Sequence, residues 1–238
     1  MKRFFSPGRL LVLLALLFAA GTAIIRFAGT GRPITASAPA GSAHTLVIDA
    51  GHGGLDGGAV SVYGDRESGI NLSIAQKLRD LCTLCGAPCV LTRDSEVLPY
   101  PQDADSVRAK KRWDLEQRVA TCNSTDGAVL ISIHQNLYPD ARPSGTQVLY
   151  ARTDGSAGFA ALTHENLLQA LCPGNRRVAS PASDAIYLLK RVECPAILVE
   201  CGFLSNPTEA QMLTDGVYQS KIAAVLCASY FQFISPIG

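Results

Sequence analysis

The chain has 238 residues, of which 21 are basic, 20 are acidic and 47% are hydrophobic. The balanced charge excludes the strongly basic surface of a nucleic-acid-binding domain, and we expect no nucleic-acid partner. The length suits one folded domain of ordinary size together with additional segments.

The first 27 residues have the pattern of an export segment. Three basic residues precede an apolar run over 10–25, and Arg26 follows it. A basic start before a hydrophobic run is typical of secretory signals and signal anchors. We expect an uncleaved membrane anchor over 1–27, with the remainder of the chain outside the cytoplasm. Small residues within the run leave cleavage, and hence a secreted protein, as the alternative.

Residues 28–43 are rich in Gly, Pro, Ser, Thr and Ala and are predicted to form a flexible linker, so the folded domain is expected over 44–238. Apolar runs of strand length alternate in this domain with segments of helical period. The predicted strands cover 46–49, 87–92, 128–133, 146–150, 186–189 and 196–199. The predicted helices cover 71–85, 113–122, 158–171 and 218–231, with a short one after Asn206, and 95–111 is predicted to be a long surface loop that can become helical toward its end. This alternation predicts an α/β fold, a three-layer αβα domain around a mostly parallel, mixed and twisted sheet of about six strands.

The strand over 46–49 leads directly into a glycine-rich turn with His52 at its apex. The turn lacks the Gly-Lys-Ser/Thr ending of a phosphate-binding loop and the spacing of the dinucleotide fingerprint. A histidine after a strand of an α/β sheet lies where such folds bind ligands. A role as metal ligand therefore explains His52 well, provided that other segments supply partners.

Two further predicted strands are also followed by a side chain that can bind metal. His134 comes after 128–133 and Glu200 comes after 196–199, and Glu67 precedes the first predicted helix. Because these strand ends share one edge of an open sheet, the side chains are expected to converge. Two imidazoles and one carboxylate with an open fourth position are a common ligand set of catalytic zinc. One carboxylate then remains free to act as a general base in hydrolysis.

Each of these side chains also fits an ordinary structural role. A lone loop histidine is more often a hydrogen-bonding group than a ligand, and Glu67 would suit the positive end of a helix dipole. Glu200 fits a structural role least, because a carboxylate in a buried strand is costly unless it is paired or bound to metal. We expect His44 and His164 to be structural.

Eight cysteines in an exported protein invite a disulfide interpretation. Cys82, Cys85 and Cys89 form a Cys-x-x-Cys-x-x-x-Cys cluster, but no second group of ligands lies at zinc-finger spacing. The density of cysteines is low for a disulfide-built scaffold. We interpret the cysteines mainly as small apolar side chains, with one or two disulfide bridges among them. Which cysteines pair stays open.

Several segments of the predicted domain match one enzyme family in order and spacing. They are Val-Ile-Asp-Ala-Gly-His-Gly-Gly-Leu-Asp-Gly-Gly-Ala, Glu67 before Asn-Leu-Ser-Ile-Ala, Leu-Thr-Arg-Asp, Ile-Ser-Ile-His-Gln-Asn and Leu-Val-Glu-Cys-Gly-Phe-Leu-Ser-Asn-Pro-Thr-Glu. On these segments the chain resembles the zinc-dependent N-acetylmuramoyl-L-alanine amidases of the amidase-3 family. The resemblance implies one zinc ion bound by His52, Glu67 and His134, with Glu200 as the catalytic glutamate.

The same resemblance implies peptidoglycan, with its glycan strands and stem peptides, as the substrate. Asn71 and Asn136 are expected to contact this substrate. An activating protein partner is conceivable but leaves no signal in the sequence. Ala50, Gln135 and Cys201 depart from the residues that are frequent in the family, and none of these departures removes a ligand.

Within the family the chain looks most like the sporulation- and germination-specific, CwlD-type amidases. The N-terminal anchor and the lack of room for wall-binding repeats are the main reasons, and they imply a role in spore cortex maturation, on the route to muramic-δ-lactam. The alternatives are a vegetative amidase for cell separation or turnover, a zinc peptidase that cuts within the stem peptide, and an inactive wall-binding module. The presence of every ligand type argues against the last of these.

Overall fold

The structure of the protein is a computed structural model that describes residues 44–235. The predicted anchor over 1–27 and linker over 28–43 lie outside the described residues and stay predictions. No helix within 44–235 has the length and hydropathy that a membrane span requires.

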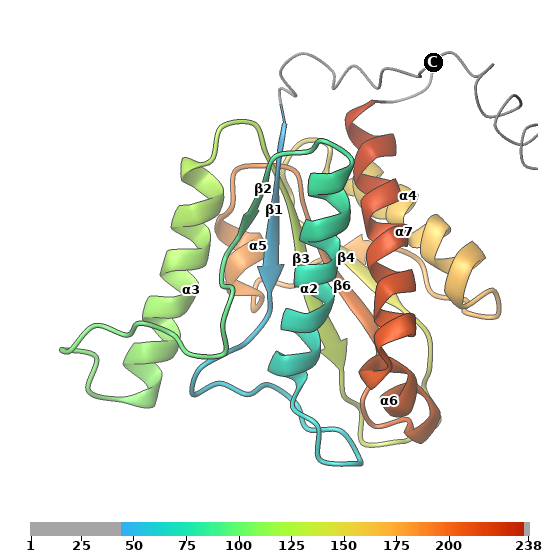
Figure 1. The fold of residues 1–238 in the computed structure, drawn as a ribbon, viewed down its shortest axis with the longest axis horizontal. Helices are drawn as coiled ribbons and strands as arrows, with labels where there is room; N and C mark the ends of the chain where they lie inside the picture. Colours follow the sequence, from blue (N-terminus) through green and yellow to red (C-terminus); the bar gives the residue numbers. More distant parts are fainter. Residues whose placement is uncertain (1–43, 236–238) are drawn as a thin grey trace, which may run out of the picture. The chain divides into compact units, whose positions relative to one another are not determined.

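A six-stranded sheet with the order β2-β1-β3-β6-β4-β5 forms the centre of the domain (Figure 1). Neighbouring strands pair in parallel except β4, which runs antiparallel to β6. The prediction of a mixed, mostly parallel sheet in an α/β fold is confirmed. The strands are β1 (Thr45–Ala50), β2 (Cys89–Leu91), β3 (Ala128–Asn136), β4 (Gln147–Tyr150), β5 (Ser180–Pro181) and β6 (Ala196–Phe203).

Helices cover both faces of this sheet and bury a separate hydrophobic cluster on each. The larger cluster lies under α2, α4 and α7, and the smaller one under α3 and α5. Because β1, β3 and β6 are covered on both sides, their sequences are almost continuously apolar, as central parallel strands are. The helices are α2 (Glu67–Leu84), α3 (Val107–Ser124), α4 (Ser156–Leu171), α5 (Tyr187–Arg191), α6 (Pro207–Thr214) and α7 (Gly216–Ile234).

One predicted strand is wrong, because the segment predicted over 186–189 forms α5. A short apolar run is compatible with a strand or with a buried turn of helix, and periodicity cannot distinguish them. Here Leu188 and Leu189 pack into the smaller cluster, while Lys190 and Arg191 lie in the last turn, where their charge suits the helix dipole. The sheet instead gains β5, which the sequence did not predict.

Two other differences affect the position of functional side chains. β3 and β6 continue past His134 and Glu200, so these residues lie inside the strands near their carboxyl ends. α3 begins at Val107, earlier than the predicted start at 113 and in the late part of 95–111, because the Ser106 hydroxyl caps it by accepting a hydrogen bond from the amide of Ala109.

Candidate metal centre

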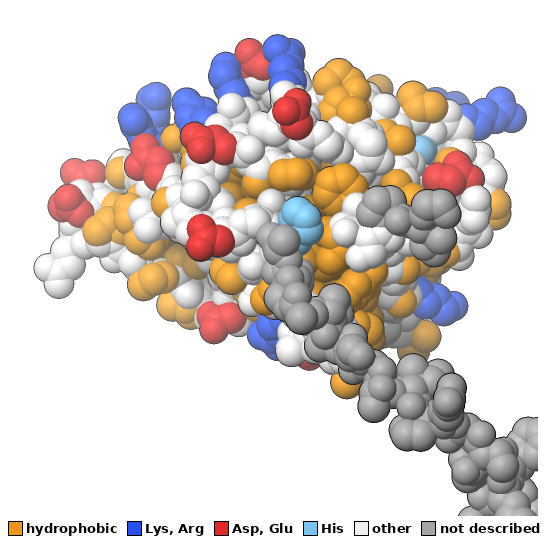
Figure 2. Space-filling model, turned by 90° about the horizontal axis from the view of Figure 1, so that it is seen from above, with side chains coloured by type: hydrophobic (Ala, Val, Ile, Leu, Met, Phe, Trp, Pro, Cys, Tyr) orange, Lys and Arg blue, Asp and Glu red, His pale blue; other side chains and the backbone are white. Residues whose placement is uncertain are grey.

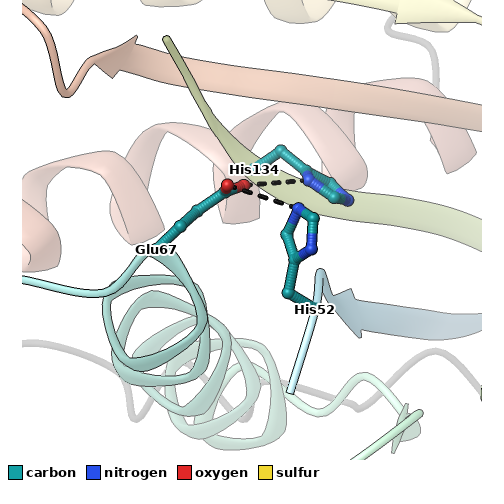
Figure 3. Close-up of side chains that lie close together, drawn as sticks. All are labelled: His52, Glu67 and His134. Atoms are coloured by element: carbon teal, nitrogen blue, oxygen red, sulfur yellow. Dashed lines mark hydrogen bonds and ion pairs between the residues drawn. The ribbon is translucent and has the colours of Figure 1, made fainter. Parts of the chain in front are cut away.

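His52, Glu67 and His134 come from three separate elements and point toward one another (Figure 3). His52 follows β1, Glu67 is the first residue of α2 and His134 lies on β3. One potential ligand atom from each residue lies within 4.8 Å of the others, and they are the only such group among residues 44–235. The predicted convergence of these three side chains at the carboxyl edge of the sheet is therefore present in the fold.

The loop after β1 holds His52 in an unusual backbone conformation. Its φ of 61° is the only positive value of a non-glycine residue in the described range. Gly51 must be a glycine, since a Cβ atom there would collide with the imidazole of His134. A Cβ on Gly58 would likewise lie 2.6 Å from Glu67 Oε2. The glycines therefore allow the backbone to pass close to the ligand side chains.

Glu67 is the most enclosed of the three, with 4% of its side chain exposed. Its Oε1 lies 3.0 Å from His134 Nδ1, and its Oε2 lies 3.3 Å from His52 Nε2. Burial opposes the charge of the carboxylate, but hydrogen bonds from His134 and His52 outweigh it and hold the pKa of Glu67 well below its ordinary value. Three further donors reach the carboxylate, from the amides of Ala59, Gln135 and the Asn71 side chain.

The imidazole of His52 has an acidic partner behind it. Asp56 Oδ2 lies 3.1 Å from His52 Nδ1, and Lys111 Nζ lies 2.7 Å from the same carboxylate. Burial lowers the pKa of His52, but the hydrogen bonds and charges of Glu67 and Asp56 raise it by more than this, so the pKa is raised above its ordinary value. A histidine that donates Nδ1–H to a carboxylate presents Nε2 to a metal, in the arrangement that orients many metal-bound imidazoles.

Glu200 lies beside His134 because the two residues are register partners on β6 and β3. The pairing shifts at a bulge between His134 and Asn136, and such irregularities are common next to functional sites. Burial raises the pKa of Glu200 to about 6. Its Oε2 atom is buried and has no hydrogen-bond partner among the described residues. A buried carboxylate oxygen without a partner indicates that a ligand, water or ion completes its surroundings.

Two buried arginines hold the backbone on either side of His52. Arg118 donates to the carbonyls of His52, at 2.6 Å, and Ala50, at 2.7 Å. Arg93 donates to the carbonyls of Ala50 and Gly51 and also to that of Ser68, in the first turn of α2. The arginines therefore bind the His52 loop to the sheet and to the helix that carries Glu67.

Arg118 is itself held by two carboxylates. It donates to Asp49 at 2.7 Å and to Asp114 at 3.0 Å, and Asp49 also accepts hydrogen bonds from Ser132 and Thr92. Burial would raise the pKa of Asp49, but the charge of Arg118 and the hydroxyl donors lower it to about 2. Sequence reasoning missed this network because its members lie on three elements and on the loop after β2, which only the fold brings together.

A cavity of about 220 Å³ opens beside these residues. His52, His134 and Glu200 line it, and α3 and α5 contribute further lining residues such as Lys111 and Tyr187. Asp56, which sequence reasoning also missed, lines the same cavity. Its position four residues after His52 in a glycine-rich loop was the available signal.

The two predicted substrate contacts occupy different surroundings. Asn71 is fully buried, and its side-chain amide donates to Glu67 and to the Gly51 carbonyl while accepting from Gln135. Asn136 is partly buried and donates to the Gln147 side chain at 3.4 Å. His164, predicted to be structural, is buried away from the centre, with its Nε2 2.6 Å from the Arg177 carbonyl.

The donor set fits a divalent metal ion. Two imidazoles and a carboxylate are the common protein ligands of catalytic zinc, with a fourth position left open. In the structure the donor atoms of His52, Glu67 and His134 lie close together, and Asp56 contacts the other nitrogen of His52. Glu200, the register partner of His134, has a buried carboxylate oxygen without a hydrogen-bond partner among the described residues. The group can therefore hold a metal ion and expose it to the cavity.

Comparisons with known proteins agree with this geometry. The sequence profile of the N-acetylmuramoyl-L-alanine amidase family known as amidase-3 matches residues 46–229. The germination-specific N-acetylmuramoyl-L-alanine amidase of Bacillus subtilis is 33% identical over 199 residues, which are 83% of this chain and 82% of that protein.

Two solved structures share the fold. The CwlD amidase from Clostridioides difficile, solved in complex with the GerS lipoprotein, is 34% identical with a TM-score of 0.76, over 80% of this chain and 98% of that one. An N-acetylmuramoyl-L-alanine amidase from Clostridium difficile 630 is 27% identical with a TM-score of 0.71, over 83% of this chain and 100% of that one. The chain belongs to the amidase-3 family of N-acetylmuramoyl-L-alanine amidases.

Proposed function

We propose that this amidase is zinc-dependent and hydrolyses the amide bond between N-acetylmuramic acid and the L-alanine of the stem peptide, with Glu200 as its general base. The observation that carries the proposal is the convergence of His52, Glu67 and His134 around one point, with the buried, unpartnered oxygen of Glu200 on the neighbouring strand. His52, Glu67 and His134 are the proposed ligands of one zinc ion. When bound there, zinc supplies a Lewis acid that polarises the scissile carbonyl and makes a water molecule more acidic.

Glu200 moves the proton in the proposed reaction. Its carboxylate accepts a proton from the attacking water and then donates it to the leaving nitrogen of L-alanine. Burial raises the pKa of Glu200 to about 6, which lets the group accept and release a proton near neutral pH. A bound cation would lower this pKa because it favours the charged carboxylate.

The remaining polar residues have supporting roles in this scheme. Asp56 orients the imidazole of His52, and Asn71 orients Glu67 from a position that has no exposed surface. We therefore place Asn71 behind the ligands rather than on the substrate. Asn136, which follows His134 on β3 and is partly buried, stays the proposed contact to the glycan or the peptide.

The proposed biological role is maturation of the spore cortex, where removal of the stem peptide precedes formation of muramic-δ-lactam. Support comes from the similarity to a germination-specific amidase over most of both chains. We propose that the enzyme acts outside the cytoplasm, held by the segment over 1–27, and that it works with a lipoprotein partner. The latter rests on the relative whose solved structure contains such a partner.

Mass spectrometry of muropeptides after digestion of purified peptidoglycan tests the reaction. We expect free stem peptides that begin with L-alanine and glycan fragments that lack peptide. Glu200→Gln should lower turnover by at least about 10³-fold while the protein still binds one zinc ion. Glu193→Gln, which changes an exposed glutamate on the loop before β6, is the matched control and should keep full activity.

The same digest distinguishes the alternatives. Fragments cut between amino acids of the stem peptide would identify a zinc peptidase and refute the amidase assignment. Substantial activity of Glu200→Gln would refute the role of Glu200. Digestion of vegetative wall in preference to spore peptidoglycan would favour the vegetative amidase.

A further inference from the structure

Lys111 brings an accessible positive charge to the cavity beside the proposed zinc centre. It lies on α3 and lines the same cavity of about 220 Å³ as His52, His134 and Glu200. Of the lysine and arginine side chains within 44–235, only Lys111 and Arg118 line this cavity, and Arg118 is buried with 3% of its side chain exposed. Lys111 has 52% of its side chain exposed, so its charge is available to a molecule that enters the cavity.

Asp56 fixes the position of this charge. The Lys111 ammonium lies 2.7 Å from Asp56 Oδ2, and the same oxygen lies 3.1 Å from His52 Nδ1. Two short contacts therefore join the ammonium to the ring of a proposed zinc ligand. An ammonium has three N–H donors, and Asp56 is the only acceptor that it has within the described part of the chain, so donors remain for a ligand.

A pair of this kind is ordinary when it lies on an open surface. Figure 2 shows the end of the domain from which β1 starts, where basic and acidic side chains lie next to one another at several places along the rim. Such exposed pairs contribute little to stability because water screens them. The pair of Lys111 with Asp56 differs because both residues line a cavity together with the proposed general base, Glu200. A role in binding therefore explains its place better than a role in stability.

Carboxylates make up most of the other charged lining of the cavity. Arg118 pairs with Asp49 and Asp114, which line it too. Glu200 has a buried oxygen without a hydrogen-bond partner among the described residues. Negative charges of this kind repel an anion from most of the cavity, so, apart from the metal centre itself, an anionic group is favoured only close to Lys111.

Apolar side chains supply much of the remaining lining. They include Leu115 on α3, Tyr187 on α5 and Leu198 on β6. The Arg191 guanidinium lies 3.7 Å from the centre of the Tyr187 ring, which helps to hold this aromatic side chain in place. A cavity of this volume is too small for a glycan strand but can take a short peptide. The stem peptide, rather than the glycan, is therefore the part of the substrate that enters it.

We propose that Lys111 binds the first free carboxylate of the stem peptide, on the residue that follows L-alanine, and thereby determines which peptides the enzyme prefers. In peptidoglycan that residue is D-glutamate joined onward through its γ-carboxyl group, so its α-carboxylate is free unless it is amidated. The inference rests on the proposed function and deepens it, since it assigns a contact to the peptide part of the substrate. Lys111 takes part in binding only, and no bond forms or breaks at its side chain.

The reach of the peptide fits this contact. A peptide chain spans at most about 3.3–3.6 Å per residue, so a carboxylate on the second residue lies roughly 7 Å from the scissile amide. The Lys111 ammonium is joined to the His52 ring by successive contacts of 2.7 and 3.1 Å, which is a distance of the same order. Carboxylates later in the peptide lie farther from the scissile bond and fit this position less well.

Two muropeptides that differ only at this α-carboxyl group, free in one and amidated in the other, test the contact. We expect the zinc-loaded protein to cleave the free-carboxylate form with a kcat/KM about 10-fold higher, mainly through a lower KM, because the contact is the same in the ground state and the transition state. Lys111→Gln should reduce this ratio to about 1, whereas Lys111→Arg, which keeps the charge, should retain most of it. A defect that Lys111→Gln transmits through Asp56 to the zinc centre would slow both substrates equally, so the ratio isolates the contact.

Arg176→Gln is the matched control. Arg176 is exposed and lines a separate cavity of about 590 Å³ between the start of β4 and the end of α4, and none of the proposed zinc ligands lines that cavity. The ratio should therefore stay unchanged in this variant. An equal kcat/KM for both substrates in the unchanged protein, a ratio that survives Lys111→Gln, or a ratio that is lost in Arg176→Gln would each overturn the proposal.

Calorimetric titration of zinc-loaded Glu200→Gln with the same two muropeptides gives a readout without turnover. The free-carboxylate form should bind about 10-fold more tightly, and Lys111→Gln in the same background should remove the difference. Equal affinities for the two muropeptides would overturn the proposal. If the unchanged protein cuts neither muropeptide between muramic acid and L-alanine, the proposed amidase reaction fails, and the ratio of affinities still decides whether Lys111 binds the carboxylate.

Discussion

Asp49 and Glu67 are both buried carboxylates with depressed pKa values, yet their partners differ in kind. Asp49 is paired with Arg118, which is always charged, and with two hydroxyl groups, so its charge is balanced within the protein. Glu67 faces two imidazoles, which balance its charge only when they are protonated. The Asp49 network is thus complete without a ligand, whereas the Glu67 group is suited to receive a cation.

His52 joins the two groups. Its ring belongs to the Glu67 group, and its carbonyl accepts a hydrogen bond from Arg118. Because the ring and the carbonyl are held by different partners, a variant can disturb one side of His52 more than the other. We therefore expect variants of the Asp49 network to change mainly stability and variants of the Glu67 group to change mainly metal affinity.

The largest effect on stability is expected from Arg118→Met. The substitution leaves Asp49 buried without its cation, and the loss of one partner of a buried ion pair costs about 3–5 kcal/mol. Urea unfolding of the metal-free protein measures the loss. Arg112→Met is the matched control on the same helix, since the Arg112 side chain is 76% exposed and its pair with Glu116 is screened by solvent, so its loss should hardly change the free energy of unfolding. An equal loss for both variants would contradict the structural role of the Asp49 network.

Glu67→Gln should lower zinc affinity strongly and the free energy of unfolding only slightly. Removal of a residue that only supports a ligand lowers metal affinity by about 10–100-fold. Loss of the ligand carboxylate itself is expected to lower zinc affinity by more than this. The free energy of unfolding of the metal-free protein should change less than in Arg118→Met, because the amide oxygen still accepts from one of the two backbone donors around Glu67 and no charge is left buried without a partner. Competition with a chromophoric chelator measures the affinity. Unchanged zinc binding would remove Glu67 from the ligand set.

Asp56→Asn tests the partner behind His52 and should have a smaller effect. We expect zinc affinity to fall by about 10–100-fold, because the asparagine no longer provides a charged acceptor for the imidazole Nδ1–H. Asp140→Asn, in an exposed loop, is the control and should leave the affinity unchanged. The same chelator competition serves for both variants.

The pH dependence of stability should also separate the two groups. The folded pKa of Asp49 is about 2 and its ordinary value is 3.8, so its contribution of about 2 kcal/mol is fully present above pH 4 and is lost as the pH falls toward 2. The pKa of His52 is raised, so its contribution is present below about pH 6.5 and is lost as the pH rises through the folded value.

Urea unfolding of the metal-free protein between pH 2 and pH 8 checks both effects. The loss on the alkaline side should become smaller in Glu67→Gln, because the main partner that raises the pKa of His52 is then neutral. The loss on the acid side that arises from Asp49 should remain in that variant. If the alkaline loss is the same in Glu67→Gln and in the unchanged protein, Glu67 does not hold the proton on His52.

The order of strands and helices was largely predictable because β1, β3 and β6 are continuous apolar runs and the helices between them have a clear period. The exceptions are short. The four-residue run over 186–189 forms α5, and β5 has only two residues, Ser180 and Pro181. At such lengths contacts with the rest of the fold outweigh local pattern.

The sequence by itself determined the family, the alternating α/β plan and the candidate ligands His52, Glu67 and His134 with Glu200, because each of these depends on residue types next to a strand or helix boundary. Only the tertiary structure decided that Arg93 and Arg118 hold the His52 loop and that Asn71 lies buried behind Glu67. These contacts connect residues on different elements, many of them far apart in the chain. Local periodicity and composition carry no information on such distances, which arise when the elements pack.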